Sequence, residues 1–189
     1  FTCAPYLLDD RPARDEQIVW AESNAVVYAN SVLGARTMKY PDYLDIAIAL
    51  TGRAPKAGCH LPEERAPQVR VTVPPLEGVD DSIWPLLGYL IGTISPDAIP
   101  LIEEVSAHSP DTDALKAFGA AFATTSAAPM FHVADVTPEA LDPKAFATLD
   151  LPTISLTHHD LLRAWRELNG ADAGPVQLVS LGNPHFSAT

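Results

Sequence analysis

The segment 23–33 is apolar and helix-forming, yet it carries the polar side chains of Ser23, Asn30 and Ser31. At about 100° per residue, Ser23 and Asn30 fall within about 20° of each other on a helix, and apolar residues cover the rest of its circumference. Such a helix is normally buried, and buried hydroxyls and amides need hydrogen-bond partners. Those partners are either neighbouring backbone groups or a bound polar ligand.

Arg36 and Thr37 lie just beyond Gly34, the glycine at which this segment ends. An arginine can bind a carboxylate or a phosphate through two parallel hydrogen bonds, so an arginine fixed beside a glycine turn is a candidate anion clamp. The alternative is a surface arginine that binds the last carbonyl groups of the helix. The residues alone leave these two roles open.

The chain has two cysteines, Cys3 and Cys59, which exclude a disulfide scaffold and fit a reducing, cytoplasmic compartment. A lone cysteine is more often a small buried side chain than a ligand, and we expect this of Cys59, although His60 is its neighbour. The Cys3 thiolate could still be one ligand of an iron–sulfur cluster whose other ligands come from distant segments.

Two histidines differ in their expected surroundings. His132 lies in a short apolar strand, which favours a core histidine with a backbone partner. His185 lies in a polar turn after an apolar run at 176–181. Because ligands bind at the carboxyl ends of strands in open α/β sheets, this turn is a better candidate for a site.

Helical and strand patterns alternate along the chain and predict the elements that must position these residues. We expect helices over about 15–33, 41–52, 82–94, 111–127 and 158–168. We expect strands over 68–73, 98–102, 129–133, 153–156 and 176–181, with a Pro-, Gly- and charge-rich loop at 53–67. This alternation predicts an α/β fold with helices layered around a largely parallel sheet.

Composition limits the classes of function. The 189 residues are 47% hydrophobic and 19% charged, which is ordinary for a globular protein with one sizeable core. The net charge of −12 disfavours nonspecific binding to nucleic acid or to an anionic membrane. No apolar run approaches the ~18–20 residues of a membrane span. Because the chain begins at Phe1 and stops soon after an expected strand, we expect it to be a piece of a longer protein.

Several motifs, in order along nearly the whole chain, resemble the aconitase X family, the compact branch of the aconitase superfamily. The most specific of them is the block at 20–36. The motifs are Thr2–Tyr6, Trp20–Arg36 (WAESNAVVYANSVLGAR), Tyr43–Ile46, Gly52–Gly58, Phe131–His132, Thr137–Ala140 and Val179–Ser187. The resemblance implies that residues 1–189 are part of an α/β catalytic region, without the swivelling domain that accompanies it in the family.

The resemblance also implies a cofactor and its ligands. Many members carry an iron–sulfur cluster held by three cysteines, of which Cys3 would be the first. At the position of the usual second ligand this chain has Asn183, and the third ligand would lie beyond Thr189. The departure at Asn183 leaves the presence and the type of cluster open, a 2Fe–2S cluster being one candidate.

Family members are dehydratases, so the resemblance implies loss of water across a Cα–Cβ bond of a small hydroxy acid. That reaction needs a base, a clamp for the carboxylate and help for the departing hydroxide. The implied catalytic residues are Ser23, Asn30, Ser31 and His60, and the implied substrate-binding residues are Arg36, Thr37 and Lys56.

The resemblance leaves alternatives for the substrate and for the class of function. Known members act on cis-3-hydroxy-L-proline or on mevalonate 5-phosphate, and the departure at Asn183 favours the former. The site would be completed by the swivelling domain or by a small subunit. The alternative from another class is a noncatalytic fragment or binding module that keeps the fold but lacks a complete site.

Overall fold

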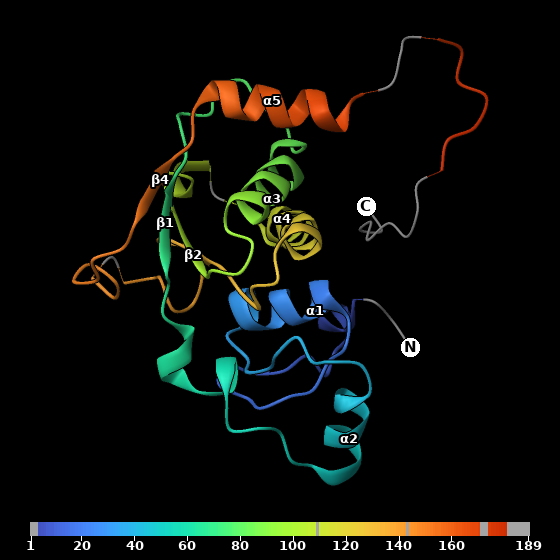
Figure 1. The fold of residues 1–189 in the computed structure, drawn as a ribbon, viewed down its shortest axis with the longest axis vertical. Helices are drawn as coiled ribbons and strands as arrows, with labels where there is room; N and C mark the ends of the chain where they lie inside the picture. The colour runs from blue at the N-terminus through green and yellow to red at the C-terminus, as the bar shows by residue number, and fades with distance from the viewer. Residues whose placement is uncertain (1–3, 109, 143, 171–173, 181–189) are drawn as a thin grey trace.

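A four-stranded parallel sheet forms one layer of the molecule, and Figure 1 shows α3, α4 and α5 on one side of it. The computed structural model describes residues 4–108, 110–142, 144–170 and 174–180. The strands, in the order β3-β2-β1-β4, are β1 (Val69–Thr72), β2 (Pro100–Glu103), β3 (His132–Val133) and β4 (Thr153–Ser155). The helices are α1 (Ser23–Tyr28, continued by a π-helix over Ala29–Leu33), α2 (Leu44–Thr51), α3 (Ile83–Ile94), α4 (Thr112–Thr125) and α5 (His158–Leu168). The predicted α/β fold is confirmed.

The sheet is built from short strands whose apolar residues face the helices. In β1 the residues alternate between buried and half-buried, and Val71 pairs with Ile102 of β2 and Ile154 of β4. Strand β2 is central and is buried at Pro100, Leu101 and Ile102. Helices α3 and α4 connect β1 to β2 and β2 to β3, as expected for parallel strands, which need crossover connections.

Helices α3 and α4 pack closely because α3 has glycines where the two backbones approach each other. A Cβ atom added at Gly88 would clash with the backbone oxygen of Phe118, and one added at Gly92 would clash with the Thr125 side chain. Phe118 and Phe122 of α4 then form an aromatic cluster with Phe131, at ring-centroid distances of 4.7 and 5.7 Å from it. This cluster lies in the main hydrophobic core between the helices and the sheet.

Local sequence signals set the starts of two helices. The Asp111 carboxylate accepts a hydrogen bond of 2.8 Å from the Ala114 amide at the start of α4. Thr157 and Asp160 form a reciprocal capping box at the start of α5, and the helix ends at Leu168, as predicted. Caps of this kind satisfy backbone groups that the first helical turn leaves unpaired.

The chain before β1 forms a layer that packs against α4 mainly through α1 (Figure 1). In this layer the predicted helix over 15–33 is wrong for residues 15–22. Asp15 has a left-handed φ of 66°, and the backbone of 15–18 bonds instead to the returning segment 34–36. The Ile18 amide donates to the Arg36 carbonyl at 3.0 Å, and the Arg36 amide donates to the Glu16 carbonyl at 2.8 Å. These tertiary hydrogen bonds replace the helical ones that the acidic residues and the spacing had indicated.

The predicted strand over 176–181 is wrong for residues 176–180, and Leu181 lies outside the described residues. Val176, Leu178 and Val179 are 76%, 85% and 68% exposed, and the segment has no regular structure. An apolar run indicates a preference for burial, but a strand forms only beside a partner strand. The described part of the chain places none there.

None of the described helices is long and apolar enough to cross a membrane.

Candidate functional site

The end of α1 is shaped by a π-helical turn. The chain widens over Ala29–Leu33, where the amides of Gly34 and Ala35 both bond to the Ala29 carbonyl, the latter at 2.9 Å. Gly34 ends the turn with a left-handed φ of 71°, which glycine adopts without steric cost. Such turns are frequent at functional sites. Asn30 and Ser31 in this turn are buried, and Asn30 is hydrogen-bonded to Thr37 in the segment that follows.

The Asn30 amide is fully committed to hydrogen bonds within the protein. Its nitrogen donates to the carbonyls of Thr37 and Pro129 at 3.0 and 2.9 Å. Its oxygen accepts from the Thr37 amide at 3.0 Å and from Arg65 Nη1 at 3.2 Å. Asn30 thus fixes the backbone of Thr37 directly, and its partners are protein groups rather than groups left free for a ligand.

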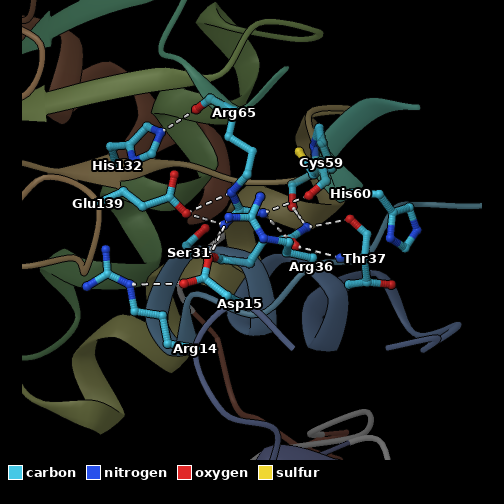
Figure 2. Close-up of polar contacts among 12 residues, drawn as sticks. Arg14, Asp15, Ser31, Arg36, Thr37, Cys59, His60, Arg65, His132 and Glu139 are labelled. Atoms are coloured by element: carbon cyan, nitrogen blue, oxygen red, sulfur yellow. Dashed lines mark hydrogen bonds and ion pairs between the residues drawn. The ribbon is translucent and has the colours of Figure 1, made fainter. Parts of the chain in front are cut away.

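Arg65 lies at the centre of the polar contacts in Figure 2 and is 1% exposed. Its Nε donates to the Glu139 carboxylate at 2.7 Å, and Nη2 donates to the same oxygen. The remaining donors bond to Asn30 Oδ1, to the Asn30 carbonyl at 2.9 Å and to the Cys59 carbonyl at 3.1 Å. All five N–H groups therefore have acceptors, which offsets the cost of burying the charge.

Arg36 combines an ion pair with a free donor. Its Nη2 lies 2.5 Å from the Asp15 carboxylate, and its side chain is 13% exposed. The hydrogen bond from Arg36 lowers the pKa of Asp15, so that the pair stays ionised at neutral pH. Arg36 Nη1 is buried and has no hydrogen-bond partner among the described residues. A guanidinium nitrogen in this state needs an acceptor, and a carboxylate oxygen is a suitable one.

His60 belongs to a hydrogen-bonded group with Gln17 and Tyr40. The His60 Nδ1 atom lies 2.5 Å from Gln17 Oε1, and the Gln17 amide nitrogen donates to the His60 carbonyl at 3.1 Å. Because Gln17 Oε1 only accepts, Nδ1 carries the proton, and Nε2 of the neutral ring accepts from the Tyr40 hydroxyl. Burial, and then the nearby Arg65 charge, lower the pKa of His60. This ring is therefore held neutral near pH 7.

Ser31 and His132 connect the layer formed by the chain before β1 to strand β3 and the residue before it. The Ser31 hydroxyl accepts a hydrogen bond of 2.9 Å from the Phe131 amide. His132 is buried, and its Nε2 donates to the Arg65 carbonyl at 2.7 Å. Burial lowers the pKa of His132 despite that bond. The prediction of a core histidine with a backbone partner is confirmed for His132.

The structure brings together Asn30, Ser31, Arg36, Thr37 and His60, the last four of which are labelled in Figure 2. It does not bring together every residue that the sequence predicted. Ser23 is exposed at the start of α1, beside α4, about 10 Å along the helix from Asn30. Lys56 is exposed, and its side chain has no hydrogen-bond or ion-pair partner among the described residues. The helical spacing indicated a shared face for Ser23 and Asn30, but Ser23 lies in the exposed first turn whereas Asn30 is buried. The roles predicted for all seven residues stay predictions.

The described residues do not supply the ligands of an iron–sulfur cluster. Cys3 and Asn183, the two predicted ligand positions, lie outside the described residues, as does His185. Within the described part, no three His, Cys, Asp or Glu side chains are grouped to hold a metal ion. Cys59 is buried, and burial raises the pKa of its thiol to about 11, so it stays protonated rather than forming a thiolate ligand.

Four residues of this site were not predicted from the sequence: Gln17, Tyr40, Arg65 and Glu139. Arg65 lies in the charged, Pro-rich loop at 53–67, where charge indicates solvation. Glu139 is half-buried in a turn and gave no signal of its own. Only the tertiary contacts identify these residues, since each acts through a partner distant in the sequence.

The fold and the site define an α/β protein with a buried polar network beside a parallel sheet. The family model for the first domain of aconitase X matches residues 1–63, and the model for the second domain matches residues 67–166. The chain therefore belongs to the aconitase X family. A structure of Thermococcus kodakaraensis aconitase X in its holo form agrees, with a TM-score of 0.76 and 34% identity over 88% of this chain and 42% of that one.

Curated relatives share more of the sequence. The chain is 56% identical to the cis-3-hydroxy-L-proline dehydratase of Pseudomonas aeruginosa, over 100% of this chain and 33% of the relative. It is 55% identical to the Hypocrea jecorina protein of the same name, over 99% and 32%. Identity to the phosphomevalonate dehydratase large subunit of Methanothermobacter thermautotrophicus is 40%, over 98% and 45%. The chain spans about a third of the first two relatives.

Proposed function

We propose that the protein containing this chain is a hydro-lyase that removes water from cis-3-hydroxy-L-proline to give a pyrroline-2-carboxylate. Identities of 56% and 55% to dehydratases of that substrate, against 40% to a phosphomevalonate dehydratase, support this choice. The observation that carries the proposal is the free Nη1 of Arg36, a buried donor suited to a carboxylate. The rival substrate is mevalonate 5-phosphate.

The reaction forms a double bond between Cα and Cβ. A base takes the Cα proton, and the electron pair of the broken Cα–H bond forms the second bond between Cα and Cβ. The Cβ–O bond breaks, and the hydroxyl leaves with a proton as water. As the Cα proton leaves, negative charge spreads into the carboxylate. A guanidinium that is already fixed by Asp15 stabilises this charge without reorganising.

The remaining residues take different parts in this proposal. Tyr40 and His60 are the pair suited to proton transfer, since a tyrosine hydroxyl already donates to a neutral imidazole. Burial raises the pKa of Tyr40, so its hydroxyl is protonated at neutral pH. Asn30 and Ser31 use their polar groups on the backbone, so we assign them to positioning. Thr37 contributes its fixed backbone.

The family resemblance adds two further elements to the proposal. An iron–sulfur cluster with Cys3 as a ligand would act as a Lewis acid on the leaving hydroxyl. A swivelling domain or small subunit would complete the site, which is consistent with the "large subunit" in the names of related dehydratases.

A substrate panel on the full-length protein tests the proposal. The protein would be incubated separately with cis-3-hydroxy-L-proline and mevalonate 5-phosphate, and loss of water would be followed by mass spectrometry. We expect dehydration of the hydroxyproline alone. Dehydration of mevalonate 5-phosphate alone would assign the rival substrate, and no dehydration of either would favour a noncatalytic binding module.

A further inference from the structure

Arg65 connects the two matched regions of the chain. It lies between residues 1–63 and residues 67–166, and its guanidinium bonds to Asn30 and Cys59 in the first region and to Glu139 in the second. Its backbone carbonyl also accepts from His132 of β3. A side chain with partners on this many segments fixes their relative positions.

Asn30 connects Arg65 to the segment that carries Arg36, the candidate carboxylate clamp. A guanidinium only donates, so Asn30 must turn its oxygen toward Arg65 Nη1, at 3.2 Å. With the oxygen placed there, the amide nitrogen faces the Thr37 carbonyl at 3.0 Å, while the same oxygen receives the Thr37 amide at 3.0 Å. Thr37 adjoins Arg36, so this pair of bonds fixes the backbone that carries the clamp.

Glu139 holds Arg65 in the orientation that this requires. The carboxylate oxygen accepts from both Nε and Nη2, which sets the plane of the guanidinium and leaves Nη1 directed at Asn30 and at the Cys59 carbonyl. Lysine could keep the charge at position 65 but has three donors on one atom, so it cannot make the five bonds in this plane.

We propose that Arg65 is a positioning residue for the Arg36–Thr37 segment: anchored by Glu139, it orients the Asn30 amide that holds Thr37 and thereby aims Arg36 at the substrate carboxylate. The proposal rests on the proposed function for the identity of what Arg36 binds. Its structural part, from Arg65 to Thr37, stands independently of any substrate.

The test compares three variants of the full-length protein: Arg65→Lys, Glu139→Gln and Lys116→Met. Lys116 is a matched control, because it is also a buried cation in an ion pair, with Asp113 in α4, but makes no hydrogen bond to Asn30. The readouts are KM and kcat for cis-3-hydroxy-L-proline and the hydrogen-exchange rate of the Thr37 amide.

Arg36 would bind the substrate carboxylate and would stabilise the further charge that develops on it in the transition state, so a misaimed clamp raises KM and lowers kcat. We expect Arg65→Lys to lower kcat/KM about tenfold, through a higher KM and a lower kcat, and to speed exchange at Thr37. Glu139→Gln shifts both readouts in the same direction by less, and decides the test if Arg65→Lys does not fold. Lys116→Met changes neither.

Wild-type KM and Thr37 exchange in both Arg65→Lys and Glu139→Gln would overturn the proposal. An equal rise in KM for Lys116→Met would also overturn it, since it would show a general effect of lost stability. If the wild-type protein dehydrates no hydroxy acid, the proposed function fails, and the exchange rate at Thr37 alone decides whether Arg65 positions this segment.

Discussion

Replacing Asn30 by alanine should cost much more stability than replacing Ser31 or Ser23. The Asn30 side chain makes four hydrogen bonds, two to Thr37 and one each to Pro129 and Arg65. At a net value of about 1 kcal/mol for each bond, Asn30→Ala should lower the free energy of unfolding by roughly 4 kcal/mol. Ser31 makes one such bond, to the Phe131 amide, so Ser31→Ala should cost about 1 kcal/mol.

Ser23→Ala is the matched control, because Ser23 is exposed at the start of α1. Ser23→Ala should change the free energy of unfolding by no more than about 0.5 kcal/mol. Urea unfolding, followed by the fluorescence of the tryptophans, gives the three values, and an unchanged m-value confirms that the unfolding transition is the same. A loss for Asn30→Ala no larger than that for Ser31→Ala would refute the reasoning. Asn30 would then be free to serve a ligand.

Three further predictions test the packing and the electrostatics. Gly88→Ala should cost about 1–3 kcal/mol by forcing α3 away from α4, whereas Gly119→Ala, where an added Cβ has only ordinary contacts, should not destabilise the protein; thermal melts compare the two. With a thiol pKa of about 11, Cys59 should resist iodoacetamide at pH 8 in the folded protein and react after unfolding, as mass spectrometry would show; equal rates would contradict its burial. Burial lowers the pKa of His60 and His132, so the unfolded chain binds more protons below about pH 6.5, and the melting temperature should fall between pH 7 and pH 5.5. His132→Asn should make the fall in melting temperature smaller. An unchanged fall would show that His132 does not contribute to it.

The elements that the sequence predicted well are those with strong local signals. Helix α5 has a capping box at its start and spans the predicted residues 158–168. Strand β1 lies within the predicted 68–73, because alternation of apolar and polar residues requires only that one face be buried. Local chemistry determines such elements, so one sequence suffices to find them.

The errors arose where tertiary contacts decide the structure. Residues 15–22 carry helix signals, but their backbone pairs with the segment at 34–36, which no local pattern shows. The run at 176–180 is apolar and exposed, because the described part of the chain offers it no partner.

The candidate site was predicted in part. The place of Arg36 after a glycine made it either an anion clamp or a surface arginine, and the family resemblance implied substrate binding for Arg36 and Thr37. The Arg36 guanidinium is paired with Asp15 and has one unpaired nitrogen, and the two roles stay predictions. Arg65 was missed because a charged residue in a loop is usually solvated, whereas four of its five hydrogen bonds go to Asn30 and Glu139, which are distant in the chain. The burial of such a charge can be predicted only when the residues that pair with it are known.

The most direct test of the central claim is the kcat/KM of Arg36→Met in the full-length protein with cis-3-hydroxy-L-proline. Arg163→Met is the control, since Arg163 is a largely exposed arginine paired with Asp160 on α5. A charge-assisted bond to a carboxylate is worth about 1.5–3 kcal/mol, so loss of the bond from Arg36 Nη1 should lower kcat/KM by about 10- to 100-fold, while Arg163→Met stays near wild type. A wild-type kcat/KM in Arg36→Met would show that Arg36 does not bind the substrate carboxylate.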